Sequence, residues 1–196
     1  MRQMKVSIIK YNAGNIRSVD YALKRLGVDA EITDDFEKIR KSDKVIFPGV
    51  GEASSTMAYL KDRGLDQLIS SLKQPVLGIC LGQQLMCSWS EEGDTECIGV
   101  FDQEVKYFPA GVKIPHMGWN SLDQLDGALF GKELLGEYVY FVHSYYVPVC
   151  EESSAITNYI VPFSAALQKD NFYATQFHPE KSGGPGQKIL SNFLNL

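Results

Sequence analysis

A cysteine stands between two contrasting segments in the run Gly78-Ile-Cys-Leu-Gly82. The residues before it resemble a short buried strand, and those after it have the pattern of a helix. On such a turn a side chain is held in a strained, accessible conformation, and glycines two positions to either side let strand and helix pass closely. The helix N-terminus also favours the thiolate, which is the nucleophilic form of cysteine. The pattern predicts a nucleophile at Cys80, and the alternative is an inert, buried cysteine.

The base for such a thiol must be one of the three histidines in the sequence: His116, His143 and His178. His178 lies in Gln176-Phe-His-Pro-Glu180, directly after a strand-like segment. The proline biases His178 toward an extended backbone, so that His178 and Glu180 can project to one side. A carboxylate beside an imidazole orients the ring and stabilises its protonated form. We therefore expect Cys80, His178 and Glu180 to act together, although His-Pro-Glu alone also suits a surface turn.

The first half of the chain alternates between predicted strands and helices. Apolar runs predict strands at residues 6–9, 30–33, 44–47 and 76–79. Helical spacing predicts helices at residues 16–26, 36–40 and 57–72, with Gly64 as a potential break in the last one. Asn15 is expected to cap the first helix and Gly27 to end it. Such alternation implies parallel strands with helices on both faces of the sheet.

The second half is predicted to be richer in strands. Strands are expected at residues 99–101, 104–108, 138–142, 155–157 and 172–177, followed by a last helix at 186–194. We find no internal repeat and no linker. The 196 residues suit one α/β domain spanning residues 1–196, with a mixed, mostly parallel central sheet, helices on both faces and a β-rich second half.

Composition narrows the classes of function. A net charge of -5 without a Lys/Arg cluster argues against a nucleic-acid partner. The first residues carry a shorter apolar run than a secretion signal needs, and no segment approaches a membrane span, so we expect a cytoplasmic protein. The four cysteines lack the spacing of a metal site or a disulfide framework. We expect no metal and no cofactor, and we expect Cys87 to pack in the core.

Together these motifs resemble the class I glutamine amidotransferases, whose nucleophile motif G-x-C-x-G-x-Q is matched by Gly78, Cys80, Gly82 and Gln84. Within that class, the chain is similar to the glutaminase subunits of imidazole glycerol phosphate synthases. The order and spacing of five further segments carry this resemblance along nearly the whole chain: residues 11–19, 48–51, 115–120, 141–146 and 176–182. The sequence fits less closely at Gln83 and at residues 183–186.

The resemblance implies that Cys80 attacks the carboxamide carbon of glutamine. The resulting oxyanion needs N–H donors, which we expect from Leu81 and from the turn formed by Gly49, Val50 and Gly51. The resemblance assigns contacts with the substrate to Gln84, Glu92, Ser144 and Tyr145. Taken without the family, Glu92 suits a solvated helix end and Gln84 an ordinary helix position.

The resemblance also implies a protein partner, a (β/α)8-barrel cyclase subunit that uses the ammonia. It places the following residues toward that partner: Asn12, Asn15, His116, Met117, Trp119, Asn120 and Lys181. Residues 116–120 also suit a plain turn with a buried tryptophan, and His143 suits a structural histidine in an apolar strand. Two rival functions are another class I glutaminase, of the pyridoxal-phosphate or anthranilate type, and a catalytically silent scaffold subunit.

Overall fold

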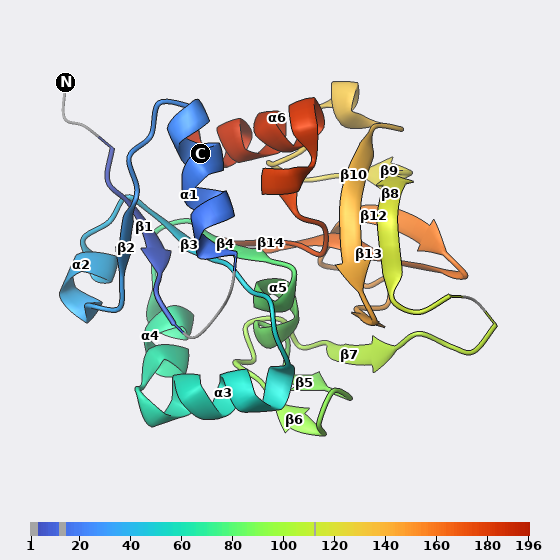
Figure 1. The fold of residues 1–196 in the computed structure, drawn as a ribbon, viewed down its shortest axis with the longest axis horizontal. Coiled ribbons are helices and arrows are strands. Elements are labelled where there is room, and N and C mark those ends of the chain that lie inside the picture. Colours follow the sequence, from blue (N-terminus) through green and yellow to red (C-terminus); the bar gives the residue numbers. More distant parts are fainter. Residues whose placement is uncertain (1–3, 12–14, 112) are drawn as a thin grey trace.

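The computed structural model describes residues 4–11, 15–111 and 113–196. Within them, an eight-stranded sheet has the strand order β2-β1-β3-β4-β14-β13-β12-β9 (Figure 1). Its parallel part consists of β2 (Glu31–Thr33), β1 (Val6–Ile9), β3 (Lys44–Phe47), β4 (Val76–Ile79) and β14 (Phe172–Thr175). Its antiparallel part consists of β13 (Val161–Lys169), β12 (Ser153–Tyr159) and β9 (Gln124–Leu125). The predicted mixed, mostly parallel sheet is thus confirmed.

Helices cover both faces of the parallel part (Figure 1). One face carries α1 (Ile16–Arg25) and α6 (Gly183–Leu194). The other carries α2 (Phe36–Arg40), α3 (Ala53–Asp62), α4 (Leu65–Ser71) and α5 (Leu81–Leu85). No helix in the described residues is both long enough and apolar enough to cross a membrane.

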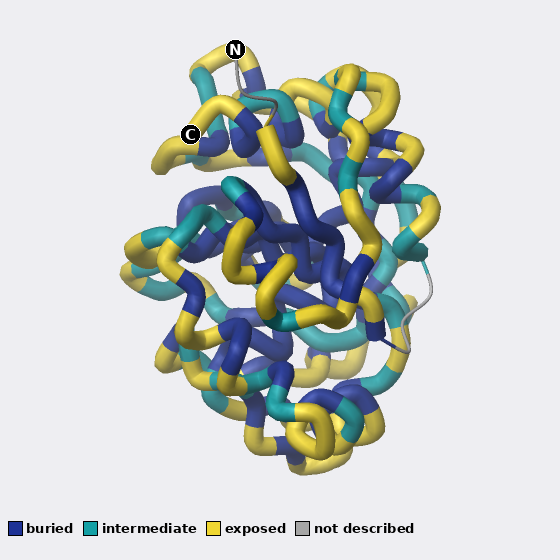
Figure 2. Tube along the Cα trace, turned by 90° about the vertical axis from the view of Figure 1, so that its left-hand side faces the viewer, coloured by how far each residue is buried: buried dark blue, intermediate teal, exposed yellow. Residues whose placement is uncertain are grey.

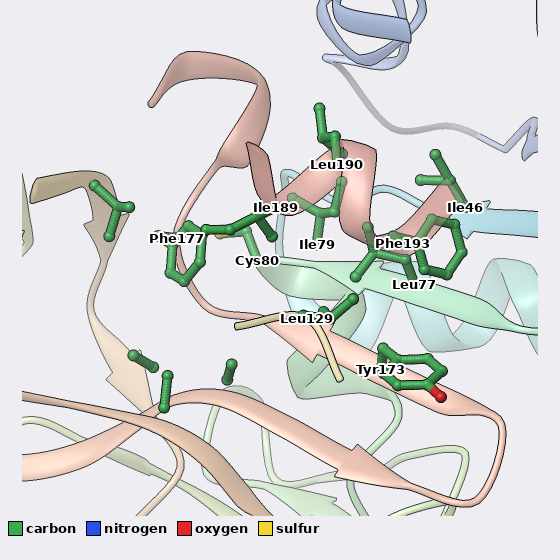
Figure 3. Close-up of a cluster of buried hydrophobic side chains, with 14 of the residues drawn as sticks. Ile46, Leu77, Ile79, Cys80, Leu129, Tyr173, Phe177, Ile189, Leu190 and Phe193 are labelled. Atoms are coloured by element: carbon green, nitrogen blue, oxygen red, sulfur yellow. The ribbon is translucent and has the colours of Figure 1, made fainter. Parts of the chain in front are cut away.

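The core is divided between two layers because side chains alternate along each strand. Ile46, Leu77 and Ile79 pack toward α6, where they meet Leu190 and Phe193 (Figure 3). The intervening strand residues pack in a second cluster with the helices of the opposite face. Both sets are buried, as expected for parallel strands covered on two sides, and the tube in Figure 2 accordingly shows buried segments in the interior.

Two smaller sheets complete the second half of the chain. An antiparallel pair joins β8 (His116–Ser121) to β10 (Tyr138–His143). The other sheet has the order β11-β7-β5-β6, formed by β11 (Tyr145–Tyr146), β7 (Glu104–Tyr107), β5 (Trp89–Ser90) and β6 (Thr95–Glu96). Two 3-10 helices, η1 (Lys132–Leu134) and η2 (Pro179–Lys181), lie in the connections.

Most first-half predictions are confirmed, including the ends of β1, β3, β4 and α2. Gly64 adopts a φ of 66° and separates α3 from α4, and Gly27, with a φ of 77°, follows the end of α1. The strand predicted at residues 99–101 is wrong. Gly99 has a φ of 77° there, and its N–H donates to the carbonyl of Cys87 at 2.8 Å, so this segment folds back on the end of α5.

Candidate active site

Three segments predicted to carry the chemistry meet at one edge of the sheet. Residues 48–51 follow β3, Cys80 follows β4, and Gln176-Phe-His178 follows β14. These strands are parallel neighbours, so their carboxyl ends lie together. A cavity of about 340 Å³ opens at this edge. It is lined by Val50, Gly51, Cys80, Leu81, Gln84, Glu92, Pro115, Val142, His143, Ser144, Tyr145 and His178.

Cys80 has the backbone conformation of a nucleophile elbow. Its φ of 55° and ψ of -107° lie in a region that non-glycine residues rarely adopt. A Cβ at Gly78 would lie 2.4 Å from Cε of Met86, and one at Gly82 would lie 2.2 Å from the carbonyl oxygen of Phe47. The two glycines are therefore needed for the close packing that holds this turn.

His178 and Glu180 are joined as the sequence predicts. Nδ1 of His178 lies 2.8 Å from Oε1 of Glu180, and both side chains are buried. Burial alone would lower the pKa of His178, but the neighbouring Cys80 thiolate and the Glu180 carboxylate raise that pKa to about 10. The arrangement therefore stabilises an imidazolium beside the thiol.

Asn15 differs from its predicted roles. It occupies the N-cap position of α1, but its φ of 72° turns the side chain away from the helix, and no cap hydrogen bond forms. Its amide nitrogen instead donates to Oε1 of Glu180 and lies 3.5 Å from Nδ1 of His178. Asn15 thus supports the carboxylate, rather than presenting its side chain freely to a partner.

The predicted oxyanion donors do not converge in this conformation. The N–H of Leu81 donates to the carbonyl oxygen of Gly49 at 3.4 Å. Since a trans peptide places its C=O and N–H on opposite sides, the N–H of Val50 points away from Leu81. Gly49, Val50, Gly51 and Leu81 therefore lie together, but a rotation of the Gly49–Val50 peptide is needed to align two donors.

The predicted substrate contacts line the cavity. Nε2 of Gln84 donates to the carbonyl of Tyr145 and to Oε1 of Gln176, both at 3.0 Å, which leaves Oε1 of Gln84 for a ligand. The carbonyl of Ser144 accepts the N–H of Phe108 at 3.1 Å. The backbone carbonyls of Ser144 and Tyr145 are thus already engaged.

Glu92 is not at a helix end, because α5 stops at Leu85. It lies between β5 and β6, where its carboxylate accepts the N–H of Ala53 at 2.8 Å. Burial raises the pKa of this carboxyl. The short turn that brings Glu92 back to the cavity was not evident from Ser90-Glu-Glu-Gly93.

The segment 116–120 forms a strand, not a plain turn. Alternation along β8 places Met117 and Trp119 outward, 61% and 55% exposed. Trp119 pairs in register with Tyr140, whose ring lies 5.9 Å from Nζ of the exposed Lys181. This forms an exposed apolar surface, here called the β8–β10 face.

The other residues predicted to meet a partner are less exposed or lie elsewhere. His116 is only 4% exposed, because alternation turns it inward from β8, so the structure does not offer it for direct contact. Asn120 is partly buried. Asn12 lies outside the described residues.

Sequence reasoning missed two side chains near the thiol. Nε2 of Gln176 donates to Sγ of Cys80 at 3.7 Å. Tyr11 is buried, its hydroxyl donates to the carbonyl of Pro48, and burial together with Cys80 raises its pKa. The only available signal was the position of Gln176, two residues before His178. In the described part of the chain, no group of three or more His, Cys, Asp or Glu side chains is placed to hold a metal ion.

Residues 5–196 match the family model described as glutamine amidotransferase class-I, and the chain belongs to this family. It is 64% identical over 196 residues to the imidazole glycerol phosphate synthase subunit HisH of Bacteroides fragilis, covering 98% of this chain and 100% of that one. It is 45% identical to the corresponding subunit of Haemophilus influenzae, covering 97% of each chain. Within the family, the chain therefore groups with the HisH subunits.

Solved structures show the same fold at lower sequence identity. A glutamine amidotransferase with 18% identity superimposes with a TM-score of 0.74 and covers 97% of each chain. A glutamine amidotransferase from Thermotoga maritima, with 15% identity, gives a TM-score of 0.64 and covers 100% of this chain and 84% of that one.

Proposed function

We propose that the chain is a single-domain glutaminase that acts in the cytoplasm as a subunit of imidazole glycerol phosphate synthase, in histidine biosynthesis. The observation that carries the proposal is the position of Cys80 on a strained turn, at one cavity with the paired His178 and Glu180. The identity to HisH subunits supports the particular pathway.

In the proposed reaction, the Cys80 thiolate attacks the side-chain carboxamide carbon of glutamine. The tetrahedral oxyanion accepts hydrogen bonds from the N–H groups of Leu81 and Val50 once the Gly49–Val50 peptide has rotated. The His178 imidazolium protonates the departing amine, and ammonia leaves with formation of a glutamyl thioester. Neutral His178 then takes a proton from water, which attacks the thioester and releases glutamate. Glu180 orients the imidazole throughout.

The ammonia would pass to a (β/α)8-barrel cyclase subunit. That partner would combine it with a phosphoribulosyl formimino carboxamide nucleotide to form imidazole glycerol phosphate and an aminoimidazole carboxamide nucleotide. The β8–β10 face supports docking of a protein, because Met117 and Trp119 are large and exposed, and Tyr140, which pairs with Trp119, lies beside the Lys181 ammonium. No nucleic acid or membrane is required.

The orientation of the Gly49–Val50 peptide supports control by the partner. Loss of one oxyanion donor typically costs about 10²–10³ in rate, so the free chain should hydrolyse glutamine slowly. The test is steady-state hydrolysis by the chain alone, with the cyclase subunit, and with that subunit plus its nucleotide ligand. We expect activity to rise across the series. Equal rates in the chain alone and in the liganded complex would contradict the control.

The two rival functions are distinguished by the same preparation. A silent scaffold would show no glutamine hydrolysis in any of the three assays. A glutaminase of the pyridoxal-phosphate or anthranilate type would not be activated by a cyclase subunit. The complete set of Cys80, His178 and Glu180 disfavours the scaffold, and the identity to HisH subunits disfavours the other glutaminases.

A further inference from the structure

Two buried histidines, His116 and His143, have no part in the proposed chemistry. They are 4% and 6% exposed, and they lie on the paired strands β8 and β10. Nδ1 of His116 lies 3.0 Å from Nε2 of His143. The pair is packed among aromatic rings: His116 stacks on Tyr159 at 3.9 Å, and Phe163 lies 5.2 Å from His143. Buried polar groups in such surroundings are costly unless they are fully hydrogen-bonded.

The hydrogen bonds of the pair fix where its protons lie. Nδ1 of His143 is 2.7 Å from the carbonyl oxygen of Tyr145, which can only accept, so this nitrogen carries the proton. In a neutral ring Nε2 of His143 is then the acceptor, and Nδ1 of His116 must donate to it. Nε2 of His116 accepts in turn from the amide of Asn120 at 3.4 Å. All three bonds run in one direction, from Asn120 to the carbonyl of Tyr145.

The relay ends beside the nucleophile. The Tyr145 carbonyl oxygen that accepts the hydrogen bond from His143 also accepts a hydrogen bond from Gln84. The second N–H of the Gln84 amide donates a hydrogen bond to Oε1 of Gln176, and the amide nitrogen of Gln176 donates to Sγ of Cys80. The orientation of Gln84, and hence of its free Oε1 in the cavity, therefore depends on a carbonyl that His143 holds from the other side.

Only the neutral pair can make this relay. Protonation of His143 would set its Nε2–H against the Nδ1–H of His116 across the 3.0 Å contact, and protonation of His116 would set its Nε2–H against the donating amide of Asn120 at 3.4 Å. Burial lowers the pKa of His116 to about 4 and that of His143 to about 3, so both rings stay neutral near pH 7.

We propose that His143 and His116 are positioning residues, which fix the Tyr145 carbonyl and through it hold Gln84 and Gln176 in place around Cys80. The proposal rests on the glutaminase function given above. In this proposal, the two histidines keep the glutamine-binding groups of the cavity in their correct positions, and neither histidine contacts the reacting atoms.

The first test compares two substitutions that keep different halves of the His143 ring. His143→Asn keeps a donor near the position of Nδ1, whereas His143→Gln reaches only the position of Nε2. We expect kcat/KM for glutamine, measured in the complex with the cyclase subunit, to fall about 10- to 100-fold in His143→Gln, chiefly through KM, as for a lost buried donor. His143→Asn should stay much closer to the wild type. Equal losses in both variants, or none in either, would overturn the proposal.

A double-mutant cycle separates positioning from simple packing. If His143 acts through Gln84, His143→Gln should cost little further activity in a Gln84→Ala background. Additive losses would instead mean that His143 acts independently of Gln84. The ammonium-dependent synthase reaction of each complex is the control for folding and assembly, and it should be unchanged.

A measurement without turnover tests the relay itself. In the ¹⁵N-histidine-labelled chain, NMR should show His116 and His143 neutral near pH 7, both protonated on Nδ1. An Nε2-protonated His143 would overturn the proposal even if the enzyme is active. An inactive wild-type complex with the expected tautomers would instead count against the glutaminase function.

Discussion

His178 and the His116–His143 pair occupy similarly buried places but carry opposite charge preferences. The pKa of His178 is raised to about 10, while those of His116 and His143 are lowered to about 4 and 3. Burial disfavours the charged ring in all three. The difference is that Glu180 and the Cys80 thiolate face His178, whereas the pair faces mainly aromatic rings, a carbonyl and an amide. A few charged neighbours therefore decide whether a buried histidine can hold a proton or must remain neutral.

Cys80→Ala should have the largest effect, because it removes the nucleophile. We expect glutamine hydrolysis to be abolished, while the assembled synthase still uses added ammonium, since the thiol makes ammonia and does not consume it. The pKa of His178, followed by NMR, should fall because the thiolate that raises it is gone. Loss of ammonium-dependent turnover in a correctly assembled complex would contradict this division of labour.

His178→Ala should be next in size, with a loss of about 10²–10⁴ in kcat for glutamine, the usual contribution of general acid–base catalysis. Glu180→Ala should lose less, because it leaves the base in place and removes only its orientation. Steady-state hydrolysis in the complex measures both. Wild-type activity in His178→Ala at matched folding would show that the charged histidine is not the acid–base group.

The pH dependence of the free energy of unfolding below pH 7 should show that His116 and His143 are neutral in the folded chain. Between about pH 6.5 and 4, an unfolded histidine binds a proton that His116 and His143 do not, so stability is lost as the pH falls, by up to about 1.4 kcal/mol per pH unit for each ring. Urea unfolding across this range should therefore show a smaller slope in His143→Asn than in the wild type. Equal slopes would show that His143 is not held neutral.

His178 should instead affect the free energy of unfolding at alkaline pH. Its pKa is raised in the folded state, so the stability it adds is fully present below about pH 6.5 and is lost as the pH rises toward 10. Glu180→Gln should weaken this alkaline loss and leave the acid limb unchanged. A change confined to the acid limb would reverse the assignment of the two sites.

The smallest effect is expected at a second thiol. Cys87 is fully buried, its Sγ donates to the carbonyl of Gln83 at 3.5 Å, and burial raises its pKa well above the usual range. Cys87→Ala should leave glutamine hydrolysis unchanged. A glutamine-like electrophile should label Cys80 alone by mass spectrometry, and labelling at Cys87 would refute the assignment of the nucleophile.

The parallel half of the fold could be predicted because its signals are local. The apolar run of β3 stops at Pro48 and Gly49, and Gly78 and Gly82 marked the turn at Cys80 that ends β4. The second half was harder to predict. The sequence interpretation missed β13, and it left residues 116–120, which form β8, open to a turn. The strand character of β13 depends on its pairing with β12 and β14, and that of β8 depends on its pairing with β10, which lies further along the chain.

The site shows the same limit. The resemblance to a family predicted roles for Gln84, Ser144 and Tyr145. The partners and directions of their hydrogen bonds could be determined only from the folded structure. Asn15 has a helix-capping residue type, and its contact with Glu180 joins positions 165 residues apart. The turn at Gly49 likewise depends on close packing against α5, since a Cβ at Gly49 would lie 2.6 Å from the nitrogen of Gly82.

The Gly49 carbonyl that accepts the Leu81 N–H has a consequence for inhibitors. If the rotated peptide is populated at about 1% in the free chain, a mimic of the tetrahedral intermediate binds about 100-fold more weakly than to the rotated form. By reciprocity, such a mimic must tighten binding of the cyclase subunit by the same factor by which that subunit tightens the mimic. An inhibitor screen on the isolated chain would then favour compounds that stabilise the idle enzyme, and the assembled complex would favour those that lock the two subunits together.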